Sequence, residues 1–269
     1  MKKNLLMIIA MFIATGLSAQ FYAGVKLGYG FGAQKTAFGT TQTDNSQENI
    51  WGSVGQGFTP GLKVGFFFND NIGIEMQMNY FMGATITAAD VNMTGYTNST
   101  TAQSSQFRLI PALVYKTDLG LYGRFGMVLP VTGKTIVEQT EVTDMGGGVT
   151  VTQEVIQELK GAFSMGFAGA IGYEFEISDA LMFFGEFEYI GLNIKGNTAT
   201  VTQYNVNGAD QLAAMTTYQK ETTYVDMLDA TSNNGAYNAT PDMAVARDAM
   251  RSSSGYSSFR INVGVSMYF

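Results

Sequence analysis

The chain ends in the stretch Ser-Ser-Phe-Arg-Ile-Asn-Val-Gly-Val-Ser-Met-Tyr-Phe, residues 257–269. From Phe259 to Phe269 every second residue is apolar, and most of the residues between them are polar or small. A period of two is typical of a β-strand with one apolar face, because successive side chains of a strand point to opposite faces. The alternation lasts for the roughly 10 residues that a tilted strand needs to cross a bilayer. The stretch therefore predicts a membrane-spanning strand.

Other segments of the chain share this alternation. With the last strand, they cover approximately residues 21–31, 57–68, 72–84, 104–116, 119–131, 161–177, 181–194 and 256–269. Short connections with turn-forming residues (69–71, 117–118 and 178–180) alternate with long ones (32–56, 85–103, 132–160 and 195–255). We therefore predict an all-β fold for residues 20–269, an eight-stranded antiparallel up-and-down transmembrane β-barrel with long extracellular loops. The alternative is ten strands, with another pair inside 195–255.

Charged residues occupy the opposite phase of the same strands. We call the following residues the charge network: Lys26, Lys63, Glu75, Arg108, Arg124, Glu174, Glu186, Glu188 and Arg260. Turning the strands over would place its cations against lipid, at a cost of about 2–4 kcal/mol each near the midplane. The sum, roughly 10–20 kcal/mol, is comparable with the whole stability of a domain. We therefore predict that the charge network faces the interior and that the apolar residues face lipid.

Residues 1–19 have the features of a secretory signal peptide. They contain two lysines, an apolar run over 5–17 and small residues before Gln20, and we predict cleavage after Ala19. The alternative is an N-terminal membrane helix. No later apolar run is long enough for a membrane-spanning helix. Export also argues against the other fold with alternating strands, a soluble sandwich whose charged face lies in water.

The interior of an eight-stranded barrel is a space that side chains just fill, so we expect a polar core rather than an open pipe. Strand register predicts three interactions there: Lys63 with Gln77 and Glu75, Arg124 with Glu174, and Glu188 with Arg260. We interpret the network as a salt-bridged core that holds the barrel together, and the alternative is a selective constriction for ions. Interior positions Phe81, Ile110 and Phe184 leave room for an apolar cleft that opens sideways between strands.

The loop 132–160 has a pattern of its own. Thr135–Val142 and Val149–Val155 are both strand-like, and a glycine-rich turn, Asp144–Gly148, joins them. These features predict a hairpin that continues the barrel strands above the membrane.

The longest loop, 195–255, exceeds an ordinary connection and is expected to be functional or disordered. Thr198–Val206 predicts an extension of the preceding strand. Asp242–Met250 predicts a short helix, with Thr240 as its N-cap and Pro241 as its first residue.

The chain contains no histidine and no cysteine. That excludes Ser-His and Asp-His hydrolysis, thiol catalysis, disulfides and His-based metal sites. Asp226 and Asp229 could hold a cation, although two carboxylates at this spacing are more often solvated. With a net charge of −7 and no basic cluster, the chain is not expected to bind nucleic acid. We predict a protein without enzymatic activity, cofactor or metal.

Four residues near the C-terminus, Asn262, Gly264, Met267 and Phe269, resemble the C-terminal assembly signal of bacterial outer-membrane β-barrels. Together with the signal peptide, the strands and the loop pattern, they make the mature chain resemble the small outer-membrane β-barrel superfamily, which includes the transmembrane domains of OmpA, OmpX and OmpW. The resemblance implies a monomer in a Gram-negative outer membrane, with lipid and the barrel-assembly machinery as partners. Unlike full-length OmpA, the chain ends with its last strand, so anchoring to the cell wall is not expected.

Two functions are compatible with these features. Loops make up slightly more than half of the mature chain, which favours a surface-displayed barrel that mediates adhesion or interaction with a host or cell-surface partner. The alternative, which the resemblance to OmpW allows, is porin-like passive transport of small hydrophobic molecules or ions.

Overall fold

A computed structural model describes residues 20–269, and the predicted signal peptide, residues 1–19, lies outside them. Strands dominate the described residues, with η1 (Leu212–Ala214) and α2 (Thr217–Lys220) as short helical turns in the longest loop. In this part of the chain no helix is both long and apolar enough to cross a membrane. The prediction of an all-β, mainly antiparallel fold is confirmed.

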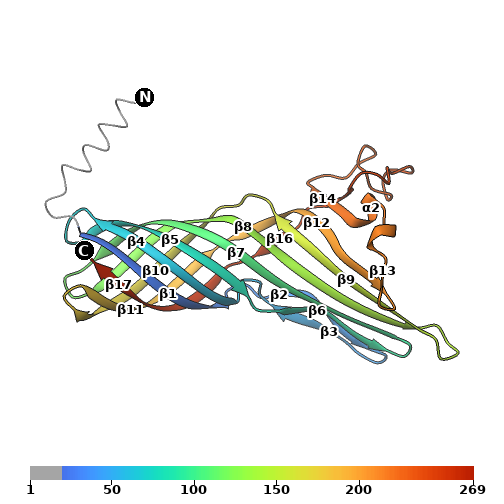
Figure 1. Cartoon of the computed structure of the whole chain (residues 1–269), viewed down its shortest axis with the longest axis horizontal. Coiled ribbons are helices and arrows are strands. Elements are labelled where there is room, and N and C mark those ends of the chain that lie inside the picture. Colours follow the sequence, from blue (N-terminus) through green and yellow to red (C-terminus); the bar gives the residue numbers. More distant parts are fainter. Residues whose placement is uncertain (1–19) are drawn as a thin grey trace.

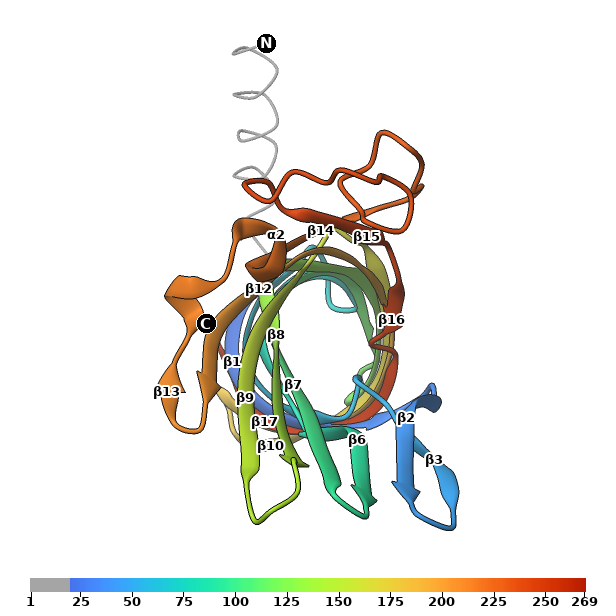
Figure 2. The same cartoon turned by 90° about the vertical axis from the view of Figure 1, so that its right-hand side faces the viewer.

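The central feature of the fold is a closed circuit of antiparallel strands, which we call the ring. In order around the circuit its members are β1 (Gln20–Gly32), β4 (Gly57–Phe67), β5 (Ile72–Gly83), β7 (Tyr96–Lys116), β8 (Leu121–Asp144), β10 (Gly166–Ser178), β11 (Leu181–Gly191) and β17 (Ser258–Tyr268). The last strand pairs with the first, from Tyr22 opposite Tyr268 to Gly32 opposite Ser258, and an end-on view shows the closed outline (Figure 2). β11 pairs directly with β17, so residues 195–255 insert no strand between these two along Leu181–Ile190.

Two ring strands are much longer than predicted. The strand predicted at 104–116 begins at Tyr96, and the one predicted at 119–131 continues to Asp144. These extensions pair with each other from Tyr96 opposite Thr143 down into the ring. Their many threonines and valines suit a pleated, half-buried surface, so the pairing continues past the point where the apolar alternation stops.

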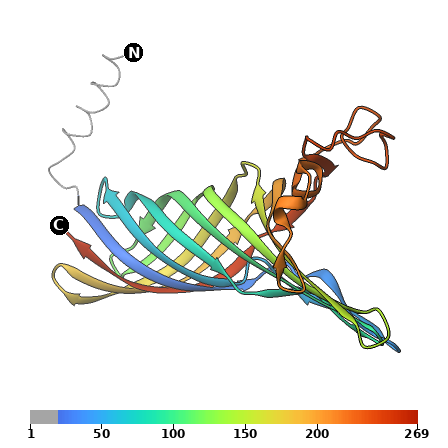
Figure 3. The same cartoon turned by 45° about the vertical axis from the view of Figure 1, so that its right-hand side comes forward.

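Beyond the ring, the long strands continue into what we call the projecting sheet. Its strand order is β3 (Gln47–Gly52), β2 (Thr36–Thr43), β6 (Ile86–Met93), the upper halves of β7 and β8, β9 (Thr150–Gly161) and β12 (Asn193–Val206). All these contacts are antiparallel except that between β2 and β6, which is parallel. The sheet extends far past the end of the ring where the long loops emerge (Figures 1 and 3).

Two predictions for the long loops are confirmed by this sheet. β8 and β9 form the predicted hairpin, paired from Thr135 opposite Leu159 to Asp144 opposite Thr150. The predicted strand Thr198–Val206 lies within β12, which pairs with β9.

The predicted helix over Asp242–Met250 is wrong. The side-chain amide of Asn233 donates to the carbonyls of Asp242, Val245 and Ala246, with N···O distances of 3.0, 3.2 and 3.1 Å. Those contacts hold the segment in a turn rather than in the pattern of a helix. The following residues form β15 (Arg247–Met250), which pairs in parallel with β14 (Glu221–Val225).

The remaining strands of the longest loop are short, namely β13 (Ala209–Asp210) and β16 (Ser253–Gly255). Asp226 accepts from Arg251 at 2.9 Å, and the carboxylate of Asp229 accepts from the backbone and hydroxyl of Thr231 at 2.8 and 2.6 Å. These two carboxylates serve a surface ion pair and a turn. Among residues 20–269, no group of three or more potential metal-ligating side chains comes together.

The two faces of the ring divide as the alternation predicts. Large apolar side chains on the outside remain exposed, for example Phe125 at 65%, Ile171 at 67% and Phe187 at 72%. Polar and charged side chains of the opposite phase are buried inside. This distribution is the reverse of a water-soluble protein and suits a cylinder surrounded by lipid.

Candidate functional site

All residues of the charge network are buried inside the ring, and none is more than 8% exposed. They come from β1, β4, β5, β7, β8, β10, β11 and β17, so every strand of the ring contributes at least one of them. The interior of the ring is therefore the first candidate site.

Arg124 on β8 is the centre of the network. Its Nη1 donates to Glu75 Oε1 on β5 at 2.9 Å, and its Nη2 donates to Glu186 Oε1 at 3.0 Å and Glu188 Oε1 at 2.8 Å on β11. The planar guanidinium is suited to such multiple contacts, because its N–H donors have a fixed fork geometry. One side chain thus joins three strands across the interior.

The two lysines of the network lie on either side of these carboxylates. Lys26 Nζ is 3.6 Å from Glu186 and 3.7 Å from Glu188. Lys63 Nζ is 3.7 Å from Glu174 and 3.9 Å from Glu75, and it stands 3.6 Å from the centre of the Phe184 ring. Several cations share each carboxylate, so the arrangement is a network rather than a set of isolated pairs.

Two of the three interactions predicted from register are present. Lys63 lies opposite Gln77 and contacts Glu75 diagonally, as the short turn between β4 and β5 predicts. Glu188 lies opposite Arg260, with 3.9 Å between Glu188 Oε2 and Arg260 Nη1.

The predicted pair of Arg124 and Glu174 is absent among the described residues. Arg124 lies opposite Ala170. Glu174 is four residues further along β10, nearer the short connections, and contacts Lys116 at 2.6 Å. The register between β8 and β10 passes through the long β8–β9 hairpin. Counting residues from the short turns could not determine it.

Tyrosines complete the network, and the sequence analysis did not include them. The hydroxyl groups donate from Tyr22 to Glu75 at 2.7 Å, from Tyr122 to Glu186 at 2.8 Å and from Tyr268 to Glu174 at 2.7 Å. Each is an aromatic residue at a position where the alternation of its strand otherwise places polar residues. This exception to the pattern was the signal that could have identified the tyrosines. A buried tyrosine usually finds a partner for its hydroxyl group.

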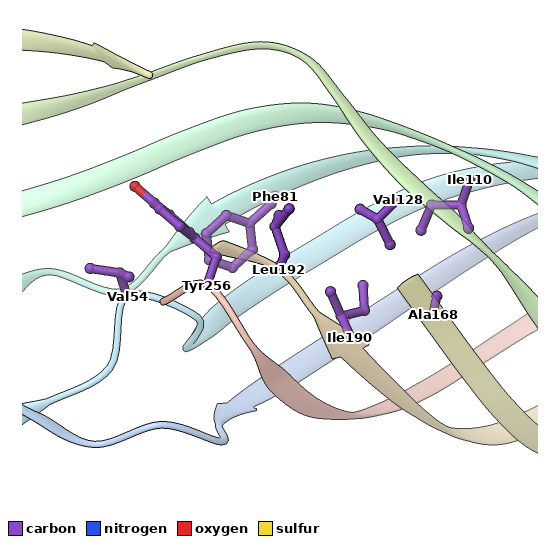
Figure 4. Packing of buried hydrophobic residues seen from close by; sticks show 8 residues of the cluster. All are labelled: Val54, Phe81, Ile110, Val128, Ala168, Ile190, Leu192 and Tyr256. Atoms are coloured by element: carbon purple, nitrogen blue, oxygen red, sulfur yellow. The ribbon is translucent and has the colours of Figure 1, made fainter. Parts of the chain in front are cut away.

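Above the ion pairs of Arg124, toward the projecting sheet, apolar side chains gather in the interior. A cluster of Val54, Phe81, Ile110, Val128, Ala168, Ile190, Leu192 and Tyr256 is buried there (Figure 4). Two of the apolar interior positions noted in the sequence, Phe81 and Ile110, belong to this cluster, whereas Phe184 lies lower, against Lys63. The apolar cluster therefore fills the interior above Arg124, and Arg108 and Arg260 of the charge network lie among its side chains, against Phe81.

A side pocket of about 260 Å³ lies where β8 changes partners. β8 pairs with β10 up to Val128 and with β9 from Thr135 onward, so residues 129–134 contact neither of these strands through the ladder. The pocket is lined on one side by Lys134 and Lys160 and reaches Gln106 and Tyr256, whose side chains belong to the interior.

The residues predicted as an assembly signal, Asn262, Gly264, Met267 and Phe269, lie along β17 and just beyond it. The side-chain amide of Asn262 donates to Glu186 at 2.8 Å and to Glu188 at 3.1 Å. A Cβ at Gly264 would overlap the Phe184 ring. The other two side chains are exposed on the apolar outside. Their role in assembly stays a prediction.

The ionised groups of this interior pair with one another. Its carboxylates are tied to cations and hydroxyl groups, and the sequence contains no histidine or cysteine that could act as a base or nucleophile. A closed antiparallel ring with an apolar outside and an ionised inside defines a membrane β-barrel protein.

Comparison with known proteins agrees with this class. The chain belongs to the outer membrane protein beta-barrel domain family, whose model matches residues 5–219. The prediction of a bacterial outer-membrane β-barrel is thereby confirmed. No curated protein matches the chain significantly.

Solved structures of outer-membrane barrels are similar over most of their length. OprG from Pseudomonas aeruginosa is 11% identical, with 94% of this chain and 96% of that chain covered and a TM-score of 0.42. CarO2 from Acinetobacter baumannii is 12% identical, with 93% and 99% covered and a TM-score of 0.39. Ail, the attachment invasion locus protein of Yersinia pestis, is 9% identical, with 93% and 97% covered and a TM-score of 0.30.

Proposed function

We propose that the ring is an eight-stranded transmembrane barrel, reached after export through a cleaved signal peptide, and that the projecting sheet is its functional surface. In this proposal the protein has no enzymatic activity and binds a partner on another cell or on the same cell surface. The supporting observation is the contrast between the two halves of the molecule. The interior of the ring is cross-linked by ion pairs, while long strands carry an ordered sheet well beyond it.

The edge of the projecting sheet supports a binding role. β3 pairs with β2 on one side, and within residues 20–269 no strand covers its other side. An uncovered edge presents backbone N–H and C=O groups to which an extended segment of a partner can add. Trp51 on this strand is 63% exposed, and tryptophan is enriched at the centres of protein interfaces.

Adhesion of bacteria that display the protein tests this proposal. We expect cells with the wild-type chain to adhere to epithelial cells, or to one another, more than cells with empty vector. Deleting the β2–β3 hairpin, residues 36–52, should reduce the gain to the vector level. The control deletes the glycine turn 146–148, which lies at the tip of the β8–β9 hairpin. A folded 36–52 deletion that still adheres like the wild type would refute the proposed role of this edge.

A second candidate function is passive uptake of small hydrophobic molecules through the side pocket. The salt-bridged layer argues against a straight route through the ring, but the apolar cluster and the pocket both lie above that layer and share Tyr256. Thr132→Trp would fill the pocket, and Thr140→Trp, on the exposed part of the same strand, is the matched control. Uptake of a labelled alkane that T132W lowers and T140W does not would support this route. Equal uptake by strains with the wild type, T132W and T140W would exclude uptake through the side pocket.

A further inference from the structure

Two arginines of the charge network differ from the third. Arg108 on β7 and Arg260 on β17 are 0% and 1% exposed, and their terminal Nη1 and Nη2 atoms make no hydrogen bond within the described chain. Each donates only through Nε, Arg108 to Gln106 at 2.9 Å and Arg260 to Ser258 at 3.0 Å. Four buried guanidinium nitrogens therefore lack a hydrogen-bond partner.

The two guanidinium groups face one aromatic ring. The Cζ atoms of Arg108 and Arg260 lie 4.3 and 5.6 Å from the centre of the Phe81 ring. Both distances end at the same point, so the two carbons are no farther apart than the sum of these distances. Two positive charges are thus buried less than about 10 Å apart, where their repulsion is weakly screened.

The carboxylates of the network do not compensate this pair. No carboxylate among residues 20–269 lies within ion-pair distance of Arg108, and the one near Arg260 is Glu188 at 3.9 Å. Glu188 already contacts Arg124 at 2.8 Å and Lys26 at 3.7 Å. In the described chain the buried lysines and arginines number five and the buried carboxylates four, so the interior as a whole carries one more positive than negative charge.

Other polar atoms without partners lie on the neighbouring strands. They include Thr59 Oγ1, Asn79 Oδ1 and Asn262 Oδ1. Asn79 stands opposite Arg108 across β5 and β7, while Gly28 on β1 stands opposite both Thr59 and Asn262. The Thr59 hydroxyl is a further donor without a partner. Of these three atoms only the Thr59 hydroxyl can donate to an anion, because amide oxygens are acceptors; Asn79 Oδ1 lies against Gly61 and Asn262 Oδ1 against Gly28.

We propose that Arg108 and Arg260 form a binding site for one small oxyanion, such as a carboxylate or phosphate, inside the barrel. A guanidinium fork matches the two oxygens of such a group, and an anion between the forks would neutralise the excess charge. The side pocket reaches Gln106, whose side-chain oxygen accepts a hydrogen bond from Arg108 Nε, although the two arginines themselves do not line the pocket. This site does not depend on the adhesive role of the projecting sheet.

Titration calorimetry on the full-length protein in detergent tests the site, with sodium phosphate and sodium acetate as separate probes against a chloride background of equal ionic strength. We expect saturable binding of one anion per chain for at least one probe. Arg108→Gln and Arg260→Gln should each weaken it at least tenfold. Arg247→Gln is the control, because Arg247 is an exposed arginine on β15. Absence of saturable binding of both probes to the wild type, or equal weakening by R247Q, overturns the proposal.

Substitution of a fully buried arginine can prevent folding, so two further measurements keep the test decisive. Arg108→Lys and Arg260→Lys retain the charge but not the fork, and we expect them to fold and to weaken binding tenfold or more. Crystals of the wild type grown with sodium selenate should show an anomalous peak between Arg108 and Arg260. Peaks confined to surface residues would identify an adventitious ion only and would refute the site.

Discussion

The guanidinium of Arg124 and the carboxylate of Glu75 form a 2.9 Å hydrogen-bonded ion pair between β8 and β5, two strands that are not neighbours in the ring. The contact crosses the interior past β7. It joins parts of the wall that no backbone hydrogen bond connects.

Substitution of Arg124 tests how much this contact stabilises the barrel. Arg124→Met leaves Glu75, Glu186 and Glu188 buried with fewer cations, so we expect the free energy of unfolding to fall by about 3–5 kcal/mol. Urea unfolding in lipid vesicles measures this loss. Lys134→Met, which removes an exposed pair with Glu158, should cost less than about 1 kcal/mol. Equal losses in the two variants would contradict a special role for the interior network.

Tyr122 lies against Gly172, and this contact gives a second prediction. A Cβ at Gly172 would overlap the Tyr122 ring, whose hydroxyl donates to Glu186 at 2.8 Å. Gly172→Ala should therefore displace the Tyr122 side chain and lower the free energy of unfolding by about 1–3 kcal/mol. Gly185→Ala is a matched control, because a Cβ there meets nothing within 4 Å. An unchanged free energy of unfolding in G172A would show that the Tyr122 side chain moves aside without cost.

The filled interior predicts the electrical behaviour of the barrel. The charge network and the apolar cluster together fill the interior of the ring, so we expect no steady single-channel conductance in planar bilayers. Brief, irregular events at high voltage are compatible with this expectation. Regular conductance steps with a defined ion selectivity would instead support the constriction that the sequence left as an alternative.

The β8–β9 hairpin allows a test by pH outside the ring. A hydrogen bond from Lys134 lowers the pKa of Glu158 below its ordinary value. The charged pair therefore stabilises the folded hairpin at neutral pH, and this contribution disappears as the pH falls through the lowered pKa of the folded state. In Lys134→Gln the pKa of Glu158 should rise toward its ordinary value, as followed by NMR titration of the carboxyl carbon. No rise would exclude Lys134 as the main cause.

Phe269 provides a test of the assembly signal. The side chain is 72% exposed, and its backbone N–H donates to the Phe21 carbonyl at 2.9 Å. Phe269→Ser should lower the amount of folded protein in the outer membrane several-fold, seen as the heat-modifiable band on gels, yet leave refolding in detergent unaffected. Phe163→Ser, another exposed aromatic, is the control. A variant that assembles in cells as well as the wild type would remove the residue from the signal.

The alternation of residues along each strand predicted which residues face the interior of the ring and which face lipid. The alternation of apolar and polar residues placed the charge network inside, since a strand has only two faces and lipid rejects charge. Register was predictable across the short turn between β4 and β5, where Lys63 and Gln77 stand opposite each other. It failed between Arg124 and Glu174, because a long hairpin separates their strands.

The sequence by itself thus determined the membrane-spanning parts of the ring strands, their two faces and the charged residues that line the interior, because these depend on neighbours along the chain and on the cost of charge in lipid. Only the tertiary structure decided which of those residues meet. Closure of the ring brings Arg124 to Glu75 across the interior and gathers Arg108 and Arg260 around Phe81. Such contacts between strands far apart in the chain follow from the curvature and closure of the sheet, and no periodicity in the sequence encodes them.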